Sequence, residues 1–130
     1  MNPEDIYQQG FTHRCEGNYG PAREAFERVL AIAPGHVKAR WQIALIQGFE
    51  GDFDASLESL KNLSTEVPTD TDIRYDYAMT AMMLGDFDTA CAEFKAILLI
   101  DPDHDKTLQQ IIYCQWKWRP FQRTSLHFVC

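Results

Sequence analysis

Proline and glycine recur in this chain at a fixed interval, and that interval limits the folds it can adopt. The members of each set lie 34 residues apart: Pro34, Pro68 and Pro102; Gly17, Gly51 and Gly85. A constant interval of this size is typical of stacked supersecondary units. Glycine favours the left-handed cap that ends a helix, and proline cannot continue one. Each interval therefore predicts two helices, the first ending before the glycine and the second before the proline.

Apolar residues at helical spacing follow each glycine and place the helices more closely. We expect seven helices, near residues 3–16, 21–33, 37–50, 54–66, 71–84, 88–101 and 105–118. Asn2 before Pro3 has the character of an N-cap followed by a first-turn proline, and Pro21 starts the second helix in the same way. The caps expected for three later helices are Asp54, Thr71 and Asp88.

The second helix of each interval repeats a small residue, a large apolar residue four later, and another apolar residue three after that. These residues are Ala22, Phe26 and Val29; Ser56, Leu60 and Leu63; Ala90, Phe94 and Ile97. Together with the 34-residue interval, this pattern resembles the tetratricopeptide repeat (TPR) family, whose unit is a pair of antiparallel helices. The family's usual tryptophan in the first helix is replaced by Ile6, Arg40 and Arg74.

The resemblance implies an all-α fold, a right-handed superhelical solenoid of antiparallel helix pairs. Its repeats would span residues 3–36, 37–70 and 71–104, and a capping helix would span 105–118. Residues 1–118 then form one TPR domain, followed by a basic and aromatic tail at 119–130. A terminal cap has to cover the apolar face of the last hairpin, and we expect Leu108, Ile111 and Ile112 to face the third repeat.

Charge and composition exclude several classes of partner. The net charge is −7 and the pI about 4.9, so the basic surface that attracts nucleic acid is missing. No apolar run approaches the roughly 20 residues that span a bilayer, and the N-terminus is acidic where a signal peptide is basic. We expect no membrane partner and a cytoplasmic location. The cysteines lie far apart and are expected to be buried, reduced thiols: Cys15, Cys91, Cys114 and Cys130.

Motifs for catalysis and cofactor binding are missing from the sequence. Serine-hydrolase, nucleotide-binding and zinc-protease patterns do not occur, and the histidines are scattered. Asp101, Asp103 and Asp105 alternate like the start of a calcium loop, but Lys106 and Ile112 stand where such a loop needs glycine and glutamate. We interpret this stretch as a solvated turn, and we expect a non-enzyme with neither metal nor cofactor.

The resemblance also implies a binding groove. In TPR proteins the first helices line the concave face, and ligand contacts come mainly from positions 2, 5, 9, 12 and 13 of each repeat. The apolar residues at these positions are the predicted groove: Tyr7, Phe11, Trp41, Leu45, Phe49, Tyr75, Met79, Met82 and Met83. A second interpretation is that the same stripe is core, as aromatic and methionine stripes at helical spacing usually are.

The groove residues favour one class of ligand over another. TPR modules that grip acidic chaperone C-termini use Lys, Asn and Arg on these faces, whereas here Lys38 is the only cation counted as well placed. We therefore expect a protein or peptide with apolar anchors, bound as an amphipathic helix or an extended segment.

Three functions remain open at the level of sequence. The first is a non-catalytic protein-interaction module. The second is the regulatory or substrate-docking part of a larger enzyme, such as a glycosyltransferase or sulfotransferase, with a further domain after residue 130. The third is self-association through the tail, because residues 1–105 carry a net charge of −11 and residues 106–130 a net charge of +4. The tail either folds back along the groove, enters a neighbour's groove, or leads toward another domain.

Overall fold

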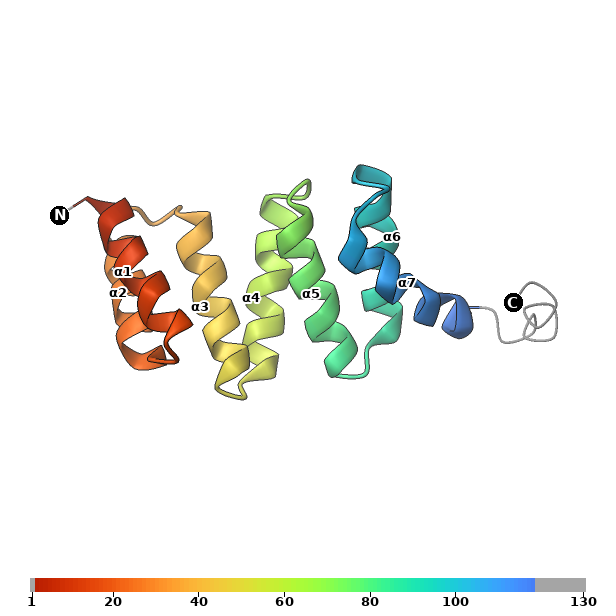
Figure 1. Cartoon of the computed structure of the whole chain (residues 1–130), viewed down its shortest axis with the longest axis horizontal. Coiled ribbons are helices and arrows are strands. Elements are labelled where there is room, and N and C mark those ends of the chain that lie inside the picture. Colours follow the sequence, from red (N-terminus) through yellow and green to blue (C-terminus); the bar gives the residue numbers. More distant parts are fainter. Residues whose placement is uncertain (1, 119–130) are drawn as a thin grey trace. The chain divides into compact units, whose positions relative to one another are not determined.

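Seven α-helices make up the computed structural model, which describes residues 2–118. They are α1 (Pro3–Cys15), α2 (Tyr19–Ile32), α3 (Val37–Phe49), α4 (Phe53–Glu66), α5 (Thr71–Met83), α6 (Phe87–Ile100) and α7 (Asp105–Trp118) (Figure 1). No strand occurs within the described residues. The all-α fold of paired helices and the existence of all seven helices are confirmed. The expectations for the tail at 119–130, including the thiol of Cys130, lie outside the described residues.

The second helices begin one or two residues earlier than expected, and their caps differ accordingly. Asp52 and Asp86 cap α4 and α6 by accepting hydrogen bonds from the backbone N–H of Ala55 and Thr89. The expected caps Asp54, Thr71 and Asp88 are wrong, because all three already lie inside the first turn of their helices. Two further caps are Asn2, which accepts from the N–H of Glu4 as expected, and Asp70, which accepts from the N–H of Ile73.

Each glycine of the 34-residue series closes the turn between the two helices of a repeat. Gly17, Gly51 and Gly85 have φ of 80°, 91° and 85°, and they alone among the described residues have positive φ. In this left-handed region an L side chain meets its own backbone, so glycine is the residue that fits. The glycine spacing therefore reports a backbone conformation repeated three times.

The chain divides into two compact units, and the first, Met1–Val67, contains α1 to α4. Its core joins residues from three helices: Ile6, Tyr7, Ala22, Ala25, Phe26, Val29, Ala39 and Ile46. Gly10 lies at the crossing of α1 and α2, where an added Cβ would come within 2.8 Å of the Phe26 ring. The small residue at this position thus allows the two helices to approach closely.

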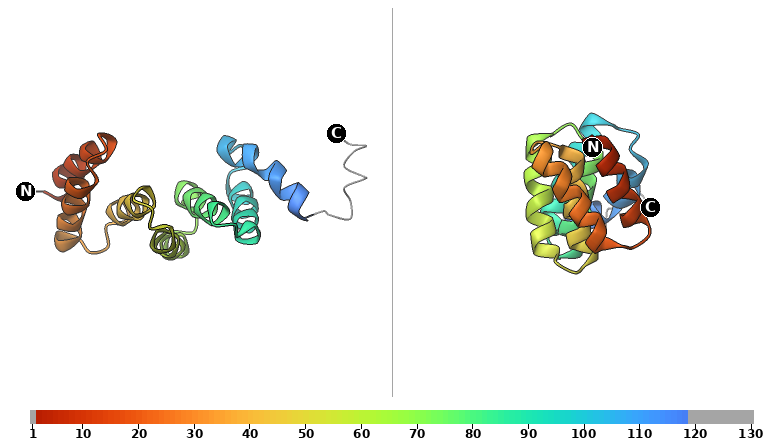
Figure 2. Two further views of the ribbon diagram at one scale, coloured as in Figure 1. Left: turned by 90° about the horizontal axis from the view of Figure 1, so that it is seen from below. Right: turned by 90° about the vertical axis from the view of Figure 1, so that its left-hand side faces the viewer.

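The second unit, Pro68–Cys130, contains α5, α6 and α7. The pairing of α5 with α6 is seen in both figures (Figures 1 and 2). Residues of both helices are buried in it: Ile73, Ala78, Ala81, Ala90, Phe94 and Ile97. A disulfide joins Cys91 of α6 to Cys114 of α7, with their Cα atoms 5.5 Å apart.

The expectation that all cysteines are buried, reduced thiols is wrong for the three that the structure describes. Cys91 and Cys114 are buried but bonded, and Cys15 is free but exposed. Cys91 and Cys114 lie 23 residues apart, in the second helix of one repeat and the helix that follows it. The spacing rules for metal sites and redox pairs do not detect such a pair, because packing of α7 on α6 brings it together.

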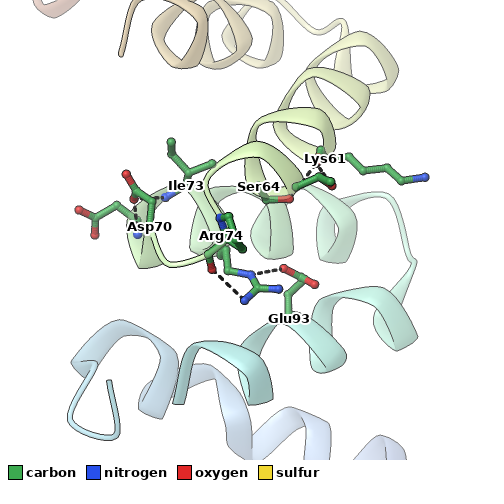
Figure 3. Close-up of polar contacts among 9 residues, drawn as sticks. Lys61, Ser64, Asp70, Ile73, Arg74 and Glu93 are labelled. Carbon is green, nitrogen blue, oxygen red and sulfur yellow. Dashed lines mark hydrogen bonds and ion pairs between the residues drawn. The ribbon is translucent and has the colours of Figure 1, made fainter. Parts of the chain in front are cut away.

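Arginine replaces the family's usual tryptophan in two repeats, and the structure gives each arginine a carboxylate. Arg40 donates to both carboxylate oxygens of Glu66, over 2.8 and 2.6 Å. Arg74 donates through Nε to Glu93, over 3.0 Å, and through Nη1 to the carbonyl oxygen of Pro68 (Figure 3). The hydrogen bonds from Arg40 hold the pKa of the Glu66 carboxyl below its usual value. An ion pair between the two helices of each repeat thus takes the place of the large apolar residue.

The capping helix α7 forms over the expected range but presents a different face to α6. Leu108 and Ile112, expected to be covered, are exposed, and Ile111 is partly buried. The buried residues are Thr107 and Cys114. They correspond to Ala39 and Ile46 of α3, each 68 residues earlier, which are also buried. The contact face of α7 is therefore the face that a first helix turns toward the preceding repeat.

Candidate functional site

Two exposed phenylalanines from different helices of the first unit lie on either side of one arginine. Phe11 of α1 is 36% exposed and Phe49 of α3 is 52% exposed. The guanidinium carbon of Arg14 lies 5.0 Å from the ring centroid of Phe11 and 6.0 Å from that of Phe49. Tyr19 of α2 stacks on Phe49, with centroids 5.5 Å apart and ring planes inclined by 27°. We call Phe11, Arg14, Tyr19 and Phe49 the Arg14 cluster.

Arg14 differs from the other arginines whose ion pairs the structure describes. Arg23, Arg40 and Arg74 each face a glutamate, whereas Arg14 has no carboxylate within ion-pair distance anywhere in residues 2–118. Its Nε is buried without a hydrogen-bond partner, and one Nη lies 4.0 Å from the sulfur of the exposed Cys15. A guanidinium is attracted to the face of an aromatic ring. The two rings therefore hold the guanidinium in place and leave its charge open to a ligand.

Tyr7 belongs to the core of the first unit. It is 7% exposed, its ring centroid lies 5.4 Å from that of Phe26, and its hydroxyl accepts a hydrogen bond from Gln42 Nε2 over 3.5 Å. Burial raises the pKa of the Tyr7 hydroxyl above its usual value. The expectation that Tyr7 presents its ring on an open face is wrong. The small Gly10 allows α1 to approach α2, and this brings the ring of Tyr7 against Phe26.

The other members of the predicted groove are divided between surface and interior. Trp41 and Leu45 of α3, and Tyr75, Met79 and Met82 of α5, are partly buried, and Met83 is exposed. Tyr75 packs against the rings of Phe94 and His104 at 6.0 and 5.8 Å, while Lys106 Nζ lies 5.7 Å from its ring centroid. Each unit thus carries its own aromatic surface with a cation against it.

Other features of the described residues offer less to a ligand. A hollow on the first unit is lined by Leu30, Arg40, Ile43, Ser59, Asn62 and Leu63, and its one cation is already paired with Glu66. No three His, Cys, Asp or Glu side chains gather as metal ligands among residues 2–118. Asp101 accepts a hydrogen bond from the backbone N–H of Asp103, so the alternating aspartates form part of the turn before α7.

Comparison with known proteins identifies the repeat. A model of the tetratricopeptide repeat family matches residues 50–111. This chain contains tetratricopeptide repeats. The resemblance drawn from the 34-residue interval is confirmed by this match and by the helix pairs of the structure. No curated protein matches the sequence significantly.

Solved structures share the fold at low sequence identity. MamA from Desulfovibrio magneticus RS-1, solved from residue 41 onward, is 20% identical; the match covers 98% of this chain and 72% of that chain, with a TM-score of 0.78. MamA AMB-1 is 23% identical over 98% of this chain and 70% of that chain, with a TM-score of 0.76. A tetratricopeptide repeat protein from Parabacteroides merdae ATCC 43184 is 16% identical over 90% and 47%, with a TM-score of 0.80. At these identities the likeness is one of fold alone.

The TPR register shows which site residues the sequence argument missed. Counted from Pro3, Arg14 is position 12 of the first repeat, one of the positions expected to line the groove, yet only Lys38 was counted as a well-placed cation. The position alone was enough to find it. Tyr19 and Lys106 carry no such signal, because one begins a second helix and the other belongs to α7. Only the packing of three helices brings Tyr19 to Phe49.

Among the described residues, no helix is both long and apolar enough to cross a bilayer.

Proposed function

We propose that this TPR chain is a protein-interaction module and that the Arg14 cluster is its principal contact surface. The observation that carries the proposal is the pair of exposed rings, Phe11 and Phe49, held on either side of an arginine without a carboxylate. Tyr75, Met79, Met82 and Met83 of the second unit, and Trp41 and Leu45 of the first, are proposed as further contacts. No catalytic role is proposed for any of them.

The exposed area of the two rings sets the scale of the interaction. A phenylalanine presents roughly 200 Å² when fully open, so the two rings leave on the order of 175 Å² exposed. Burying that area contributes about 4 kcal/mol at about 25 cal/mol per Å², before the cost of association. A single anchor residue of a peptide, seated between the rings, is enough to cover it. The aromatic surface thus fits an apolar side chain of a partner.

Arg14 adds a requirement for negative charge. A guanidinium pairs with a carboxylate through two parallel hydrogen bonds, and this pairing is strongest where the guanidinium is partly shielded from water. Arg14 is partly buried between the rings, and its charge is not matched within the described residues. The proposed partner is therefore a peptide in which an aromatic or large aliphatic residue lies beside Asp, Glu or a C-terminal carboxylate.

A peptide array tests both parts of the proposal. It pairs sequences that combine an aromatic residue with Asp or Glu with counterparts in which the acid is replaced by Asn or Gln. For peptides that bind, Phe11→Ser with Phe49→Ser is expected to weaken binding at least about tenfold, because aromatic anchors at the centre of a contact carry most of its energy. Arg14→Gln is expected to remove the preference for the acidic member of each pair.

Ile32 provides the matched control. It lies in the same unit, at the end of α2, and is 53% exposed, which equals the exposure of Phe49 within one per cent. Ile32→Ser is expected to leave binding unchanged. The proposal fails if the double serine variant binds its peptides as tightly as the unaltered protein. It also fails if Ile32→Ser weakens binding as much as the loss of the two rings.

A cytoplasmic location is part of the proposal, and the disulfide tests it. Cytosolic thiols keep most protein cysteines reduced, whereas the structure joins Cys91 to Cys114. Trapping free thiols with an alkylating reagent at the moment of cell lysis, followed by mass measurement, distinguishes the two. Alkylation of both cysteines supports a reducing compartment, and a pair protected from the reagent until reduction contradicts it.

A further inference from the structure

The capping helix leaves an apolar face open. Leu108 is 42% exposed and Ile112 is 53% exposed, and Tyr113 beside them is also exposed. Leu108 and Ile112 are four residues apart and so lie on the same side of α7. The helix is held to α6 through Thr107 and Cys114 instead. Two large aliphatic side chains at the end of the described array are therefore without a covering element among residues 2–118.

The register of the repeat identifies this face. α1, α3, α5 and α7 begin at residues 3, 37, 71 and 105, each 34 after the last. Leu108 and Ile112 are thus positions 4 and 8 of a fourth unit. Position 8 is Gly10, Ala44 and Ala78 in the three repeats, and all three are buried. Gly10 faces Phe26 of α2, and the carbonyl oxygen of Ala44 accepts a hydrogen bond from Ser56 of α4. This is the face that the second helix of a repeat covers.

The sequence after α7 continues the pattern of a second helix. The first residue of each second helix is aromatic, and the series runs Tyr19, Phe53, Phe87 and Phe121. The small residue that follows gives the series Ala22, Ser56, Ala90 and Thr124. The large buried residue gives the series Phe26, Leu60, Phe94 and Phe128. Three consecutive matches in type and spacing place residues 121–128 in the register of a fourth second helix.

We propose that residues 121–130 cover the apolar face of α7, with Phe128 against Leu108 and Ile112. The segment follows α7 directly, after the two residues Arg119 and Pro120. Its charge also suits the site, because residues 119–130 carry two arginines and no acidic residue, while the rest of the array is acidic. The chain thus supplies half of a fourth repeat as the cover of its own last helix.

Two departures make this contact looser than that of a complete repeat. Arg119 stands where Gly17, Gly51 and Gly85 have positive φ, a conformation in which an L side chain is strained. Ile112 stands where the repeats have glycine or alanine. A single added Cβ at Gly10 already comes within 2.8 Å of Phe26. Phe128 therefore packs beside Ile112 and cannot occupy the close crossing that Phe26 makes with Gly10.

A double-mutant cycle in the full chain tests the contact. Ile112→Ala, Phe128→Ala and the pair are compared by urea unfolding. If the two side chains touch, the pair changes the unfolding equilibrium constant less than the product of the single effects, by a factor of at least about 3, since contacting residues couple and distant ones do not. Leu99→Ala combined with Phe128→Ala is the control. Leu99 is an aliphatic residue of α6 and is 87% exposed, so this pair is expected to be multiplicative.

Hydrogen exchange of the backbone of α7 gives a second measure that does not depend on global stability. Phe128→Ser with Phe121→Ser is expected to speed exchange of the α7 amides several-fold and to leave α1 unchanged. Multiplicative effects in the cycle, together with unchanged exchange in α7, would overturn the proposal. Coupling that appears only as protein concentration rises would also overturn it, because the cover would then come from a second copy of the chain.

Discussion

Gly10→Ala tests how closely α1 and α2 pack, because two effects of the same substitution oppose each other there. Alanine is favoured over glycine inside a helix by about 1 kcal/mol. The added Cβ, however, would lie 2.8 Å from Cε1 and 3.0 Å from Cζ of Phe26, and 3.1 Å from the Cβ of Ala25. These separations are shorter than ordinary van der Waals contact. The outcome depends on whether Phe26 can move away.

The surroundings of Phe26 decide which effect is larger. Its side chain is fully buried, and the ring of Tyr7 lies against it at 5.4 Å. Tyr7 in turn packs on the ring of His36 and is hydrogen-bonded by Gln42. Adding a methyl group to a closely packed core costs about 1–3 kcal/mol. After the gain in helix propensity, we expect Gly10→Ala to lower the free energy of unfolding by about 1–2 kcal/mol.

Urea unfolding followed by circular dichroism measures this change, and Gly20→Ala supplies the control. Gly20 is also a helical glycine of the first unit, in α2, but an added Cβ there meets no atom within 4 Å. Only the propensity effect acts, so Gly20→Ala is expected to raise stability by up to about 1 kcal/mol. If Gly10→Ala is as stable as the unaltered protein or more so, the crossing has room for a methyl group and the reasoning is refuted.

Three further outcomes are expected. Cys91→Ser removes a crosslink that closes a loop of 23 residues, so it is expected to lower the unfolding free energy by about 3 kcal/mol in non-reducing urea unfolding, whereas Cys15→Ser changes nothing. Ala90→Leu overfills a fully buried position in α6 and is expected to cost about 1–3 kcal/mol in the same measurement. The folded state holds the pKa of Glu66 low through Arg40, so the unfolded chain takes up a proton at higher pH. This share of stability is present above the ordinary glutamate pKa of about 4.3 and is lost as the pH falls through the folded value. Glu66→Gln is expected to flatten the acid side of a plot of urea midpoint against pH, and an unchanged slope would contradict it.

The fold was predictable because the residues that determine it act locally or repeat. Gly17, Gly51 and Gly85 occupy a conformation that excludes other residues, and the interval between them sets the helix lengths. The helix starts were less predictable. Aspartates are common both as N-caps and in the first turn, so the sequence alone does not distinguish Asp52 from Asp54. The structure assigns the cap to Asp52, because its carboxylate reaches the N–H of Ala55.

The candidate site was predictable only in part, because exposure depends on neighbours that the helix pattern does not specify. Tyr7 and Phe11 share one face of α1, and their rings are stacked, yet one is core and the other surface. The difference arises from Phe26, which approaches Tyr7 across the small Gly10. The same limit applies to α7, where the expected face was wrong. A capping helix has apolar residues on two sides, and only its contact with α6 shows which side is buried.

The three repeats keep the same packing but present different chemistry. Tyr7 and Tyr75 occupy position 5 of the first and third repeats, and each packs against the histidine that caps the next helix, His36 or His104. The acidic residue at position 2 approaches the same histidine, at 2.9 Å from Glu4 and 3.9 Å from Asp72. The second repeat has different residues in all three places, namely Lys38, Trp41 and Asp70. Repetition therefore specifies the scaffold of this chain, while the residues that break the repetition, Arg14 among them, determine what each surface can bind.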